Sequence, residues 1–160
     1  MRDVLVQPPL RLVLNWSGNR VWRIDLGWAH DRSEADSVWE SRLAEGTAEF
    51  FRSYVCGEPV SAPEIPLAWQ RVRGFAGDVL SMLSACVARG EWISYSGLAR
   101  LCGVPGGARA VGGVMSRNPW PLLVPCHRVL RKNGQLGGFS SGTQLKRFLL
   151  SLEGVTPDKP

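Results

Sequence analysis

The sequence contains few residues that bind metal ions, and they are scattered along the chain. Its four cysteines form no C-x-x-C pair, and only two histidines could join them. These residues are Cys56, Cys86, Cys102, Cys126, His30 and His127. Zinc sites need clustered ligands, so we expect no metal site. In a reducing compartment, Cys56, Cys86 and Cys102 are interpreted as buried small apolar side chains.

Long apolar runs are also absent. Residues 1–14 lack the basic region, apolar run and cleavage site of a secretory signal, and no stretch approaches membrane-spanning length. A chain of 160 residues, 44% of them hydrophobic, suits one compact domain or two small ones. We expect a cytoplasmic monomer that does not associate with membranes.

Acidic residues become scarce in the second part of the chain. Residues 1–68 contain 7 basic and 10 acidic side chains, whereas residues 69–160 contain 12 basic and 4 acidic ones. A basic excess in one part of a chain is typical of nucleic-acid binding, because neutralised phosphates release counterions. A solvated basic face without a partner is the alternative that charge alone leaves open.

Two β-prone runs near the N-terminus, residues 10–16 and 21–28, are rich in Val, Leu, Ile and Trp. The triplet Ser17-Gly18-Asn19 between them predicts a hairpin. Apolar residues that include Val38 and Trp39 then predict a helix over 35–54.

Residues that cap or interrupt helices complete this part of the pattern. Asp31 or Ser33 would cap the predicted helix. Three prolines and a glycine in residues 57–66 resist both helix and strand, so a boundary is expected there. We therefore predict an N-terminal domain over 1–66 and a C-terminal domain over 67–160.

The C-terminal part has a mainly helical pattern. Helical spacing covers residues 69–88, followed by two short helical runs, 94–101 and 108–115, around a glycine-containing turn. Such a pair matches a helix-turn-helix, although any helical hairpin would look similar. The remaining predictions are a strand over 122–124, a glycine-rich stretch over 134–142 and a helix over 144–153.

The predicted fold class is therefore α/β. A small N-terminal α/β domain with a β-hairpin and a helix precedes a mainly helical C-terminal domain. The latter carries the helix-turn-helix and a loop that contains Cys126.

Cys126 stands apart from the other cysteines because His127 and Arg128 follow it. A thiol becomes reactive when an imidazole or a cation favours its thiolate. Adjacent side chains on an extended backbone point to opposite faces, so either the chain bends here or a water molecule bridges the two groups. Pro125 and the glycines that follow favour a bend, and an acid such as Glu153 could orient the imidazole.

The segment Pro125-Cys126-His127-Arg128-Val129 resembles the active-site signature of the O6-alkylguanine-DNA alkyltransferases. The resemblance covers about residues 69–155, whereas residues 1–66 resemble the family only in layout. Further matching positions are Tyr95, Leu98-Ala99, Gly103, Pro105, the run from Ala108 to Gly112, Asn118-Pro119, Lys146, Leu149-Leu150 and Glu153.

The resemblance implies direct-reversal DNA repair without an external cofactor. Cys126 would take an alkyl group from O6-alkylguanine in double-stranded DNA, or from O4-alkylthymine, and keep it as a thioether, so each molecule acts once. His127 would accept the thiol proton through a water molecule while Glu153 holds the imidazole. Tyr95 would donate a proton to the departing guanine.

The resemblance also implies a base pocket and a DNA-binding helix. Arg109 would fill the gap that the extruded nucleotide leaves in the minor groove. Small residues around it would allow close approach to the duplex, although they could equally permit helix packing. The expected pocket residues are Asn118, which would bridge the helix to the active-site strand, Val129, Phe139, Ser140, Lys146 and Met115. The expected DNA-binding residues are Arg109, Ala108, Ala110, Gly112, Tyr95, Arg117 and Arg128.

Several positions depart from the family pattern. Phe75-Ala76 stands where Phe-Gln is usual, and Val87-Ala88-Arg89 replaces the usual Ile-Pro. Phe139 stands in place of a common tyrosine and therefore lacks its hydroxyl. Ser141 replaces a common glycine, which would narrow the pocket and favour small alkyl groups; equal rates with methyl and benzyl adducts would contradict this.

Three other functions are alternatives to alkyl transfer. A protein that flags alkylated bases without repairing them would lack the nucleophile, which Cys126 supplies. A helix-turn-helix transcription regulator would read the major groove with larger polar side chains, but the helix from Ala108 offers only Arg109 and Arg117. A cysteine hydrolase is suggested only by the Cys–His pair.

Overall fold

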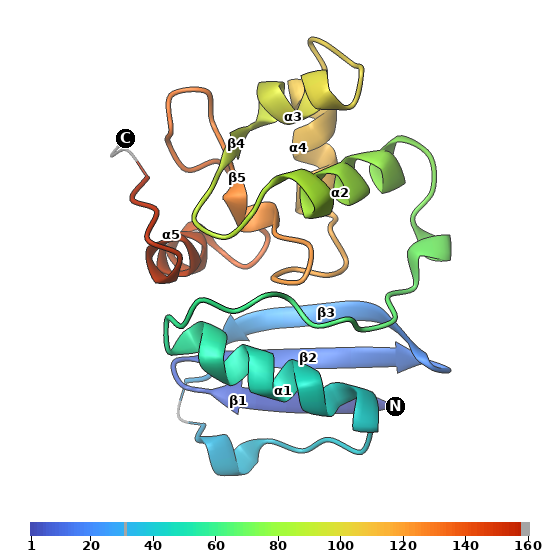
Figure 1. Ribbon diagram of the computed structural model, residues 1–160, viewed down its shortest axis with the longest axis vertical. Coiled ribbons are helices and arrows are strands. Elements are labelled where there is room, and N and C mark those ends of the chain that lie inside the picture. The colour runs from blue at the N-terminus through green and yellow to red at the C-terminus, as the bar shows by residue number, and fades with distance from the viewer. Residues whose placement is uncertain (31, 158–160) are drawn as a thin grey trace. The chain divides into compact units, whose positions relative to one another are not determined.

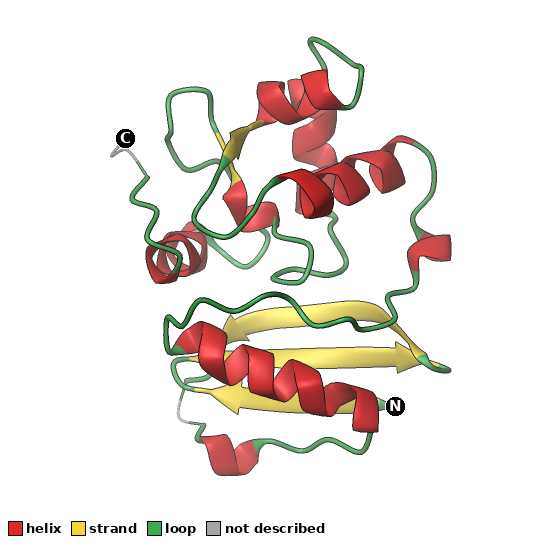
Figure 2. Ribbon diagram, in the orientation of Figure 1, coloured by secondary structure: helices red, strands yellow, loops and turns green. Residues whose placement is uncertain are grey.

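The computed structural model describes residues 1–30 and 32–157. The chain divides into two compact units, with the boundary between Arg71 and Val72. Figure 2 shows that strands dominate the first unit and helices the second. The sequence had suggested a division at 66/67. Among the described residues, no helix has both the length and the apolar character needed to cross a membrane.

The N-terminal unit is built on an antiparallel sheet with strand order β1-β2-β3 (Figure 1). The strands are β1 (Arg2–Gln7), β2 (Leu10–Ser17) and β3 (Arg20–Trp28). The predicted hairpin is confirmed by β2 and β3, which pair Leu12 with Leu26 and Leu14 with Ile24. β1 was not predicted, because its apolar residues do not alternate and its conformation depends on pairing with β2.

Helix α1 (Arg42–Val55) lies across the sheet (Figure 1) and begins later than predicted. Residues Glu34–Asp36 form a short 3₁₀ turn after Ser33, and Val38 then pairs with Val4 of β1. The first part of the predicted apolar face was wrong, because Val38 is 63% exposed and strand pairing displaces the helix start. The later part is confirmed, since Ala44, Phe50 and Phe51 of α1 are buried. Asp31, the other predicted cap, lies outside the described residues.

The C-terminal unit is mainly helical, as predicted. Its elements are α2 (Phe75–Cys86), β4 (Ile93–Ser94), α3 (Tyr95–Leu101), α4 (Ala108–Ser116), β5 (Val129–Leu130) and α5 (Thr143–Leu152). Helices α3 and α4 form the predicted helix-turn-helix pair, and the Ser94 hydroxyl caps α3 by accepting from the Gly97 amide. Helix α2 is shorter than the predicted 69–88, because Gly74 has a left-handed backbone (φ +60°) and ends the preceding turn.

The predicted strand over 122–124 is wrong. This segment is a turn in which Leu122 has a positive φ of +77°, and its apolar side chains are buried by the core rather than by a sheet. A 3₁₀ turn, Cys126–Arg128, follows and leads into β5, which pairs in parallel with β4. The chain therefore bends at the cysteine, as Pro125 indicated.

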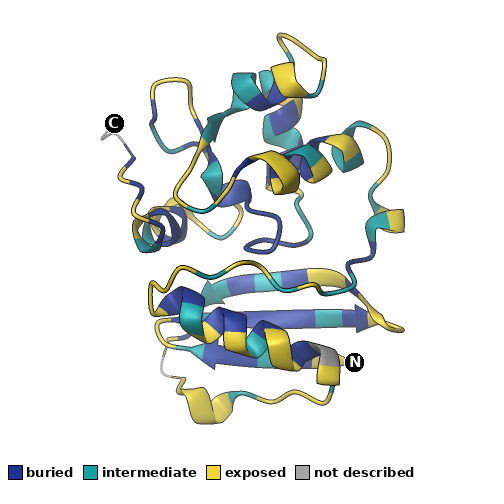
Figure 3. Cartoon of the chain, viewed as in Figure 1, coloured by how far each residue is buried: buried dark blue, intermediate teal, exposed yellow. Residues whose placement is uncertain are grey.

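The burial of the cysteines also differs from expectation (Figure 3 shows burial along the chain). Cys56 and Cys86 are exposed, and Cys102 is half-buried. Cys126 is the buried one, at 3% exposure. The sequence could not separate them, because the apolar spacing of a helix does not show which side faces the core at its last turn.

Candidate active site

Cys126 begins the 3₁₀ turn between the buried segment 122–124 and β5, and its amide donates to the Val124 carbonyl at 2.8 Å. Burial raises the pKa of the Cys126 thiol, although a hydrogen bond from Asn118 and the charge of Lys146 act in the opposite direction. The resting group is therefore a thiol, and a base must take its proton before sulfur can attack.

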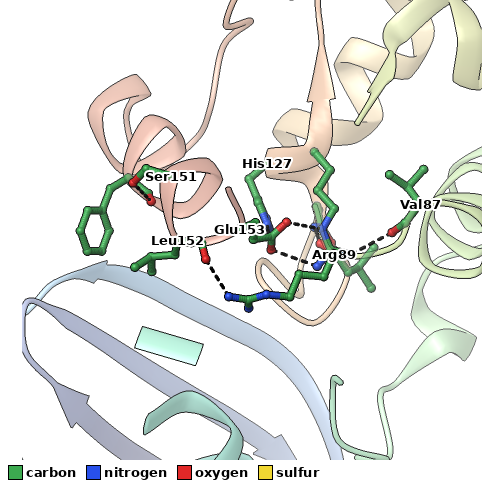
Figure 4. Close-up of polar contacts among 10 residues, drawn as sticks. Val87, Arg89, His127, Ser151, Leu152 and Glu153 are labelled. Carbon is green, nitrogen blue, oxygen red and sulfur yellow. Dashed lines mark hydrogen bonds and ion pairs between the residues drawn. The ribbon is translucent and has the colours of Figure 1, made fainter. Parts of the chain in front are cut away.

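That base is available in the next residue. His127 Nε2 lies 2.8 Å from Glu153 Oε1, and both side chains are fully buried (Figure 4). Burial would raise the pKa of Glu153, but hydrogen bonds from His127 and Arg128 outweigh it and hold that pKa well below its usual range. Burial lowers the pKa of His127. A neutral imidazole beside a carboxylate donates through Nε2, which leaves Nδ1 as the basic nitrogen.

Arg128 completes this buried network. Its Nε donates to Glu153 Oε2 at 2.8 Å, Nη2 donates to Oε1 at 3.0 Å, and Nη1 donates to the Val87 carbonyl at 2.8 Å. The side chain is only 14% exposed. The guanidinium that the sequence assigned to DNA contact is therefore occupied inside the protein, where it fixes the carboxylate that orients His127. No sequence signal connects Arg128 with a partner 25 residues away.

Asn118 joins the end of α4 to the segment before the cysteine. Its Nδ2 donates to the Val124 carbonyl at 2.8 Å, and its Oδ1 accepts from the Trp120 amide at 3.0 Å. The resemblance placed a bridge at this position, and the partner is a turn rather than a strand.

Lys146 on α5 is completely buried. Its Nζ donates to the Val129 carbonyl at 2.6 Å and lies 5.7 Å from the centroid of the Tyr95 ring. Burial lowers the pKa of Lys146 to about 8, although the Cys126 thiolate would act in the opposite direction. A cation thus lies near both the cysteine and the tyrosine, and within residues 1–30 and 32–157 it has no carboxylate partner.

The low pKa of Lys146 gives a testable stability effect. Between pH 8 and its ordinary pKa near 10, the unfolded chain binds a proton that the folded chain has lost, so this residue makes the free energy of unfolding rise with pH. The rise is on the order of 3 kcal/mol. Denaturant unfolding of wild type and Lys146→Met across this range isolates it, because the two proteins differ only at this residue. Parallel pH curves would contradict the assignment.

A cavity of about 560 Å³ opens beside α4. This volume is in the range of small-molecule sites. The lining residues are Tyr95, Ala108, Arg109, Gly112, Met115, Ser116, Arg131, Gly138, Phe139 and Ser140. Cys126, Asn118, Val129 and Lys146 do not line it, and Ala110 and Arg117 are exposed on or next to α4. The sequence did not single out Arg131, Ser116 or Gly138, since only the fold brings these segments together.

Gly137 leaves the space that the Tyr95 ring occupies. A methyl group at residue 137 would lie 2.7 Å from Cε2 and 2.8 Å from Cζ of Tyr95, and closer still to its hydroxyl oxygen. The hydroxyl lies 3.5 Å from the Gly138 carbonyl, a marginal hydrogen bond. Burial raises the pKa of Tyr95, and the Cys126 charge would raise it further, so the hydroxyl keeps its proton at neutral pH.

Gly137→Ala is therefore expected to displace the Tyr95 ring and to slow the alkyl transfer that the family resemblance implies by about 100-fold, the lower end of the effect of losing a general acid. Single-turnover rates with alkylated duplex DNA measure this effect. Gly46→Ala on α1 is the matched control, because a methyl group there meets nothing within 4 Å and residue 46 does not line the cavity. Equal rates for the two variants would show that Tyr95 does not need this glycine.

Comparisons with known proteins match the region that contains these residues. A family model described as "6-O-methylguanine DNA methyltransferase, DNA binding domain" matches residues 74–155. The methylated-DNA–protein-cysteine methyltransferase of Homo sapiens is 46% identical over 102 residues, which are 64% of this chain and 48% of the relative. The rat protein of the same name is 45% identical over 105 residues, 65% of this chain and 49% of the relative.

Two solved structures match almost the whole chain. The Mycobacterium tuberculosis OGT in complex with DNA superposes with a TM-score of 0.74 and 29% identity, over 96% of this chain and 92% of that one. The O6-methylguanine-DNA methyltransferase of Pyrococcus kodakaraensis superposes with a TM-score of 0.75 and 29% identity, over 97% and 100%.

The chain spans about half the length of the curated relatives it matches. The matched region contains the cysteine, the histidine, the glutamate and the helix-turn-helix pair described above. Because the family model covers more than half of the chain, the chain belongs to the 6-O-methylguanine DNA methyltransferase family.

Proposed function

We propose that this protein repairs DNA by transferring an alkyl group from O6 of guanine to Cys126. The observation that carries the proposal is the buried His127–Glu153 pair, which begins at the residue after the cysteine and leaves His127 Nδ1 as a base. The relatives are named for this transfer, and the M. tuberculosis OGT was solved with DNA.

The reaction follows from the protonation states of the site. His127 Nδ1 takes the thiol proton of Cys126 through a bridging water molecule, and the sulfur attacks the alkyl carbon. The S–C bond forms as the C–O6 bond breaks, and the bonding electrons leave with guanine. The Tyr95 hydroxyl donates a proton that neutralises the departing base, and proton exchange with solvent restores Tyr95 and His127. The thioether on Cys126 remains, so each molecule acts once.

The second unit would carry both DNA binding and chemistry. A stacked base hides O6 from any side chain, so the nucleotide must leave the stack and enter the cavity. Helix α4 presents the small residues Ala108, Ala110 and Gly112 around the exposed Arg109, which suits close approach to the minor groove. Double-stranded DNA that contains O6-alkylguanine is the proposed partner, and the cytoplasm the proposed location.

Arg109→Ala is expected to slow repair of O6-methylguanine in duplex DNA by about tenfold or more, because the empty stack then costs a few kcal/mol to maintain. Reaction with the free base O6-benzylguanine needs no extrusion and should keep its wild-type rate. Single-turnover rates on both substrates test this, and equal losses on both would exclude an insertion role for Arg109.

The mass of the protein after reaction tests the proposed function. Incubation with methylated duplex DNA should add one methyl group in place of the thiol proton, and peptide mapping should place it on Cys126. An unchanged mass with intact DNA binding would instead indicate a protein that only marks the lesion. Release of product with repeated turnover would indicate a hydrolase.

A further inference from the structure

Arg131 lines the cavity but takes no part in the chemistry described above. It is exposed and follows β5 directly. Among residues 1–30 and 32–157, no hydrogen bond or ion pair engages its guanidinium. Arg128, three residues earlier, is fully committed to Glu153 and the Val87 carbonyl. The two arginines therefore differ: Arg128 is engaged inside the protein, whereas Arg131 is exposed to solvent.

The fold sets Arg131 beside Tyr95. Strands β4 and β5 pair in parallel, Ile93 with Val129 and Ser94 with Leu130. Tyr95 and Arg131 are the residues that directly follow these two strands. The electrostatics agree, since the charge of Arg131 opposes the rise that burial causes in the Tyr95 pKa.

The backbone that presents Arg131 is fixed by its own turn. The Arg131 amide donates to the Gln135 carbonyl at 2.9 Å, and the Gly134 amide donates to the Arg131 carbonyl at 3.0 Å. Its side chain thus starts from a defined position on the cavity wall.

The cavity wall has two cations and no carboxylate. Arg109 comes from α4, whereas Arg131 comes from the segment after β5. Arg131 is therefore suited to bind an anion. A guanidinium can bind a phosphate through two parallel hydrogen bonds. An exposed residue on the wall lies where the cavity meets solvent, while Cys126 is buried and does not line the cavity. When a base enters a cavity, its phosphates stay at the entrance.

We propose that Arg131 binds the backbone phosphate next to the everted nucleotide. Arg109 lines the same cavity from α4, whereas Arg131 lines it from the segment after β5. Arg131 is then a positioning residue that holds the nucleotide in its extruded state. The proposal rests on the proposed function, and it names a DNA contact outside the helix-turn-helix.

Arg131→Gln tests the contact. Repair of O6-methylguanine in duplex DNA at subsaturating protein should slow by about tenfold, as for loss of a hydrogen bond to a charged group. Binding to the same duplex is measured in a Cys126→Ala background. The slope of log affinity against log salt concentration should become shallower by about one, the change expected for the loss of one phosphate contact. The rate with free O6-benzylguanine should not change. Arg131→Lys should recover part of the duplex rate, since it keeps the charge but not the fork.

Lys132→Gln is the matched control, because it removes the same charge from the next exposed residue, which does not line the cavity. An equal loss in Lys132→Gln would overturn the proposal in favour of general attraction. A loss confined to an O6-carboxymethyl adduct would overturn it too, since Arg131 would then bind the lesion. Wild-type protein inactive on both substrates overturns the proposed function, whereas active wild type with an unaffected Arg131→Gln overturns only the phosphate contact.

Discussion

Replacing Cys126 with alanine will abolish the proposed alkyl transfer while the protein still folds and keeps its proposed binding to alkylated DNA. The rate should fall to background, because no other group in the site can form a stable thioether. Removing the sulfur leaves a small cavity in a site that is 3% exposed, which costs about 1 kcal/mol. Mass spectrometry after incubation with methylated duplex, together with a binding assay on the same DNA, measures both outcomes.

The other cysteines supply the control for this experiment. Cys86→Ala removes a thiol from the exposed end of α2 and should keep the full reaction. A methyl group found on Cys86 or Cys102 in wild type would contradict the assignment of Cys126, as would transfer that persists in Cys126→Ala.

Glu153→Gln should be the most damaging conservative change outside the cysteine. The substitution keeps the shape but removes the charge that His127 and Arg128 share, and it leaves the Arg128 guanidinium partly buried without a counterion. Breaking such a buried pair costs about 3–5 kcal/mol. The proposed alkyl transfer should fall as well, because an amide donates as well as accepts and so no longer specifies the His127 tautomer. Denaturant unfolding and single-turnover rates measure the two losses.

The pH dependence of stability distinguishes this role from mere packing. The folded pKa of Glu153 lies below the unfolded value near 4, so the unfolded chain takes up the proton first as pH falls. The wild-type free energy of unfolding should therefore fall on acidification below about pH 5, and Glu153→Gln should lose that part of the slope. Glu91→Gln, on an exposed carboxylate of the same unit, should change stability by less than about 0.5 kcal/mol and keep the slope.

Local sequence patterns predicted the elements whose stability is local. The hairpin of β2 and β3 follows from alternation around a turn, and α3 and α4 follow from apolar spacing around glycines. The N-terminal helix was misjudged because Val38 pairs with Val4, a contact 34 residues away in the chain that no local spacing encodes. The turn at 122–124 was misjudged for a related reason, since its apolar run is buried by the core without strand partners.

The site was predictable where a motif is contiguous and less so where the fold assembles it. Cys126 and His127 follow from adjacent residues, and Glu153 could be named as an acid that would reach the imidazole. The engagement of Arg128 and the place of Arg131 at the cavity depend on how β5 runs beside β4 and ends near α5. A basic residue looks the same in sequence whether its charge faces a carboxylate or solvent.

The burial of the four thiols has a consequence for the survival of the protein under oxidation. Cys56 and Cys86 face solvent, whereas the sulfur of Cys126 is enclosed and mostly protonated. Peroxides and soluble disulfides react with accessible thiolates, so they will consume the outer sulfurs first. The molecule can thus carry glutathione adducts on its exposed cysteines while the thiol of Cys126 remains unmodified.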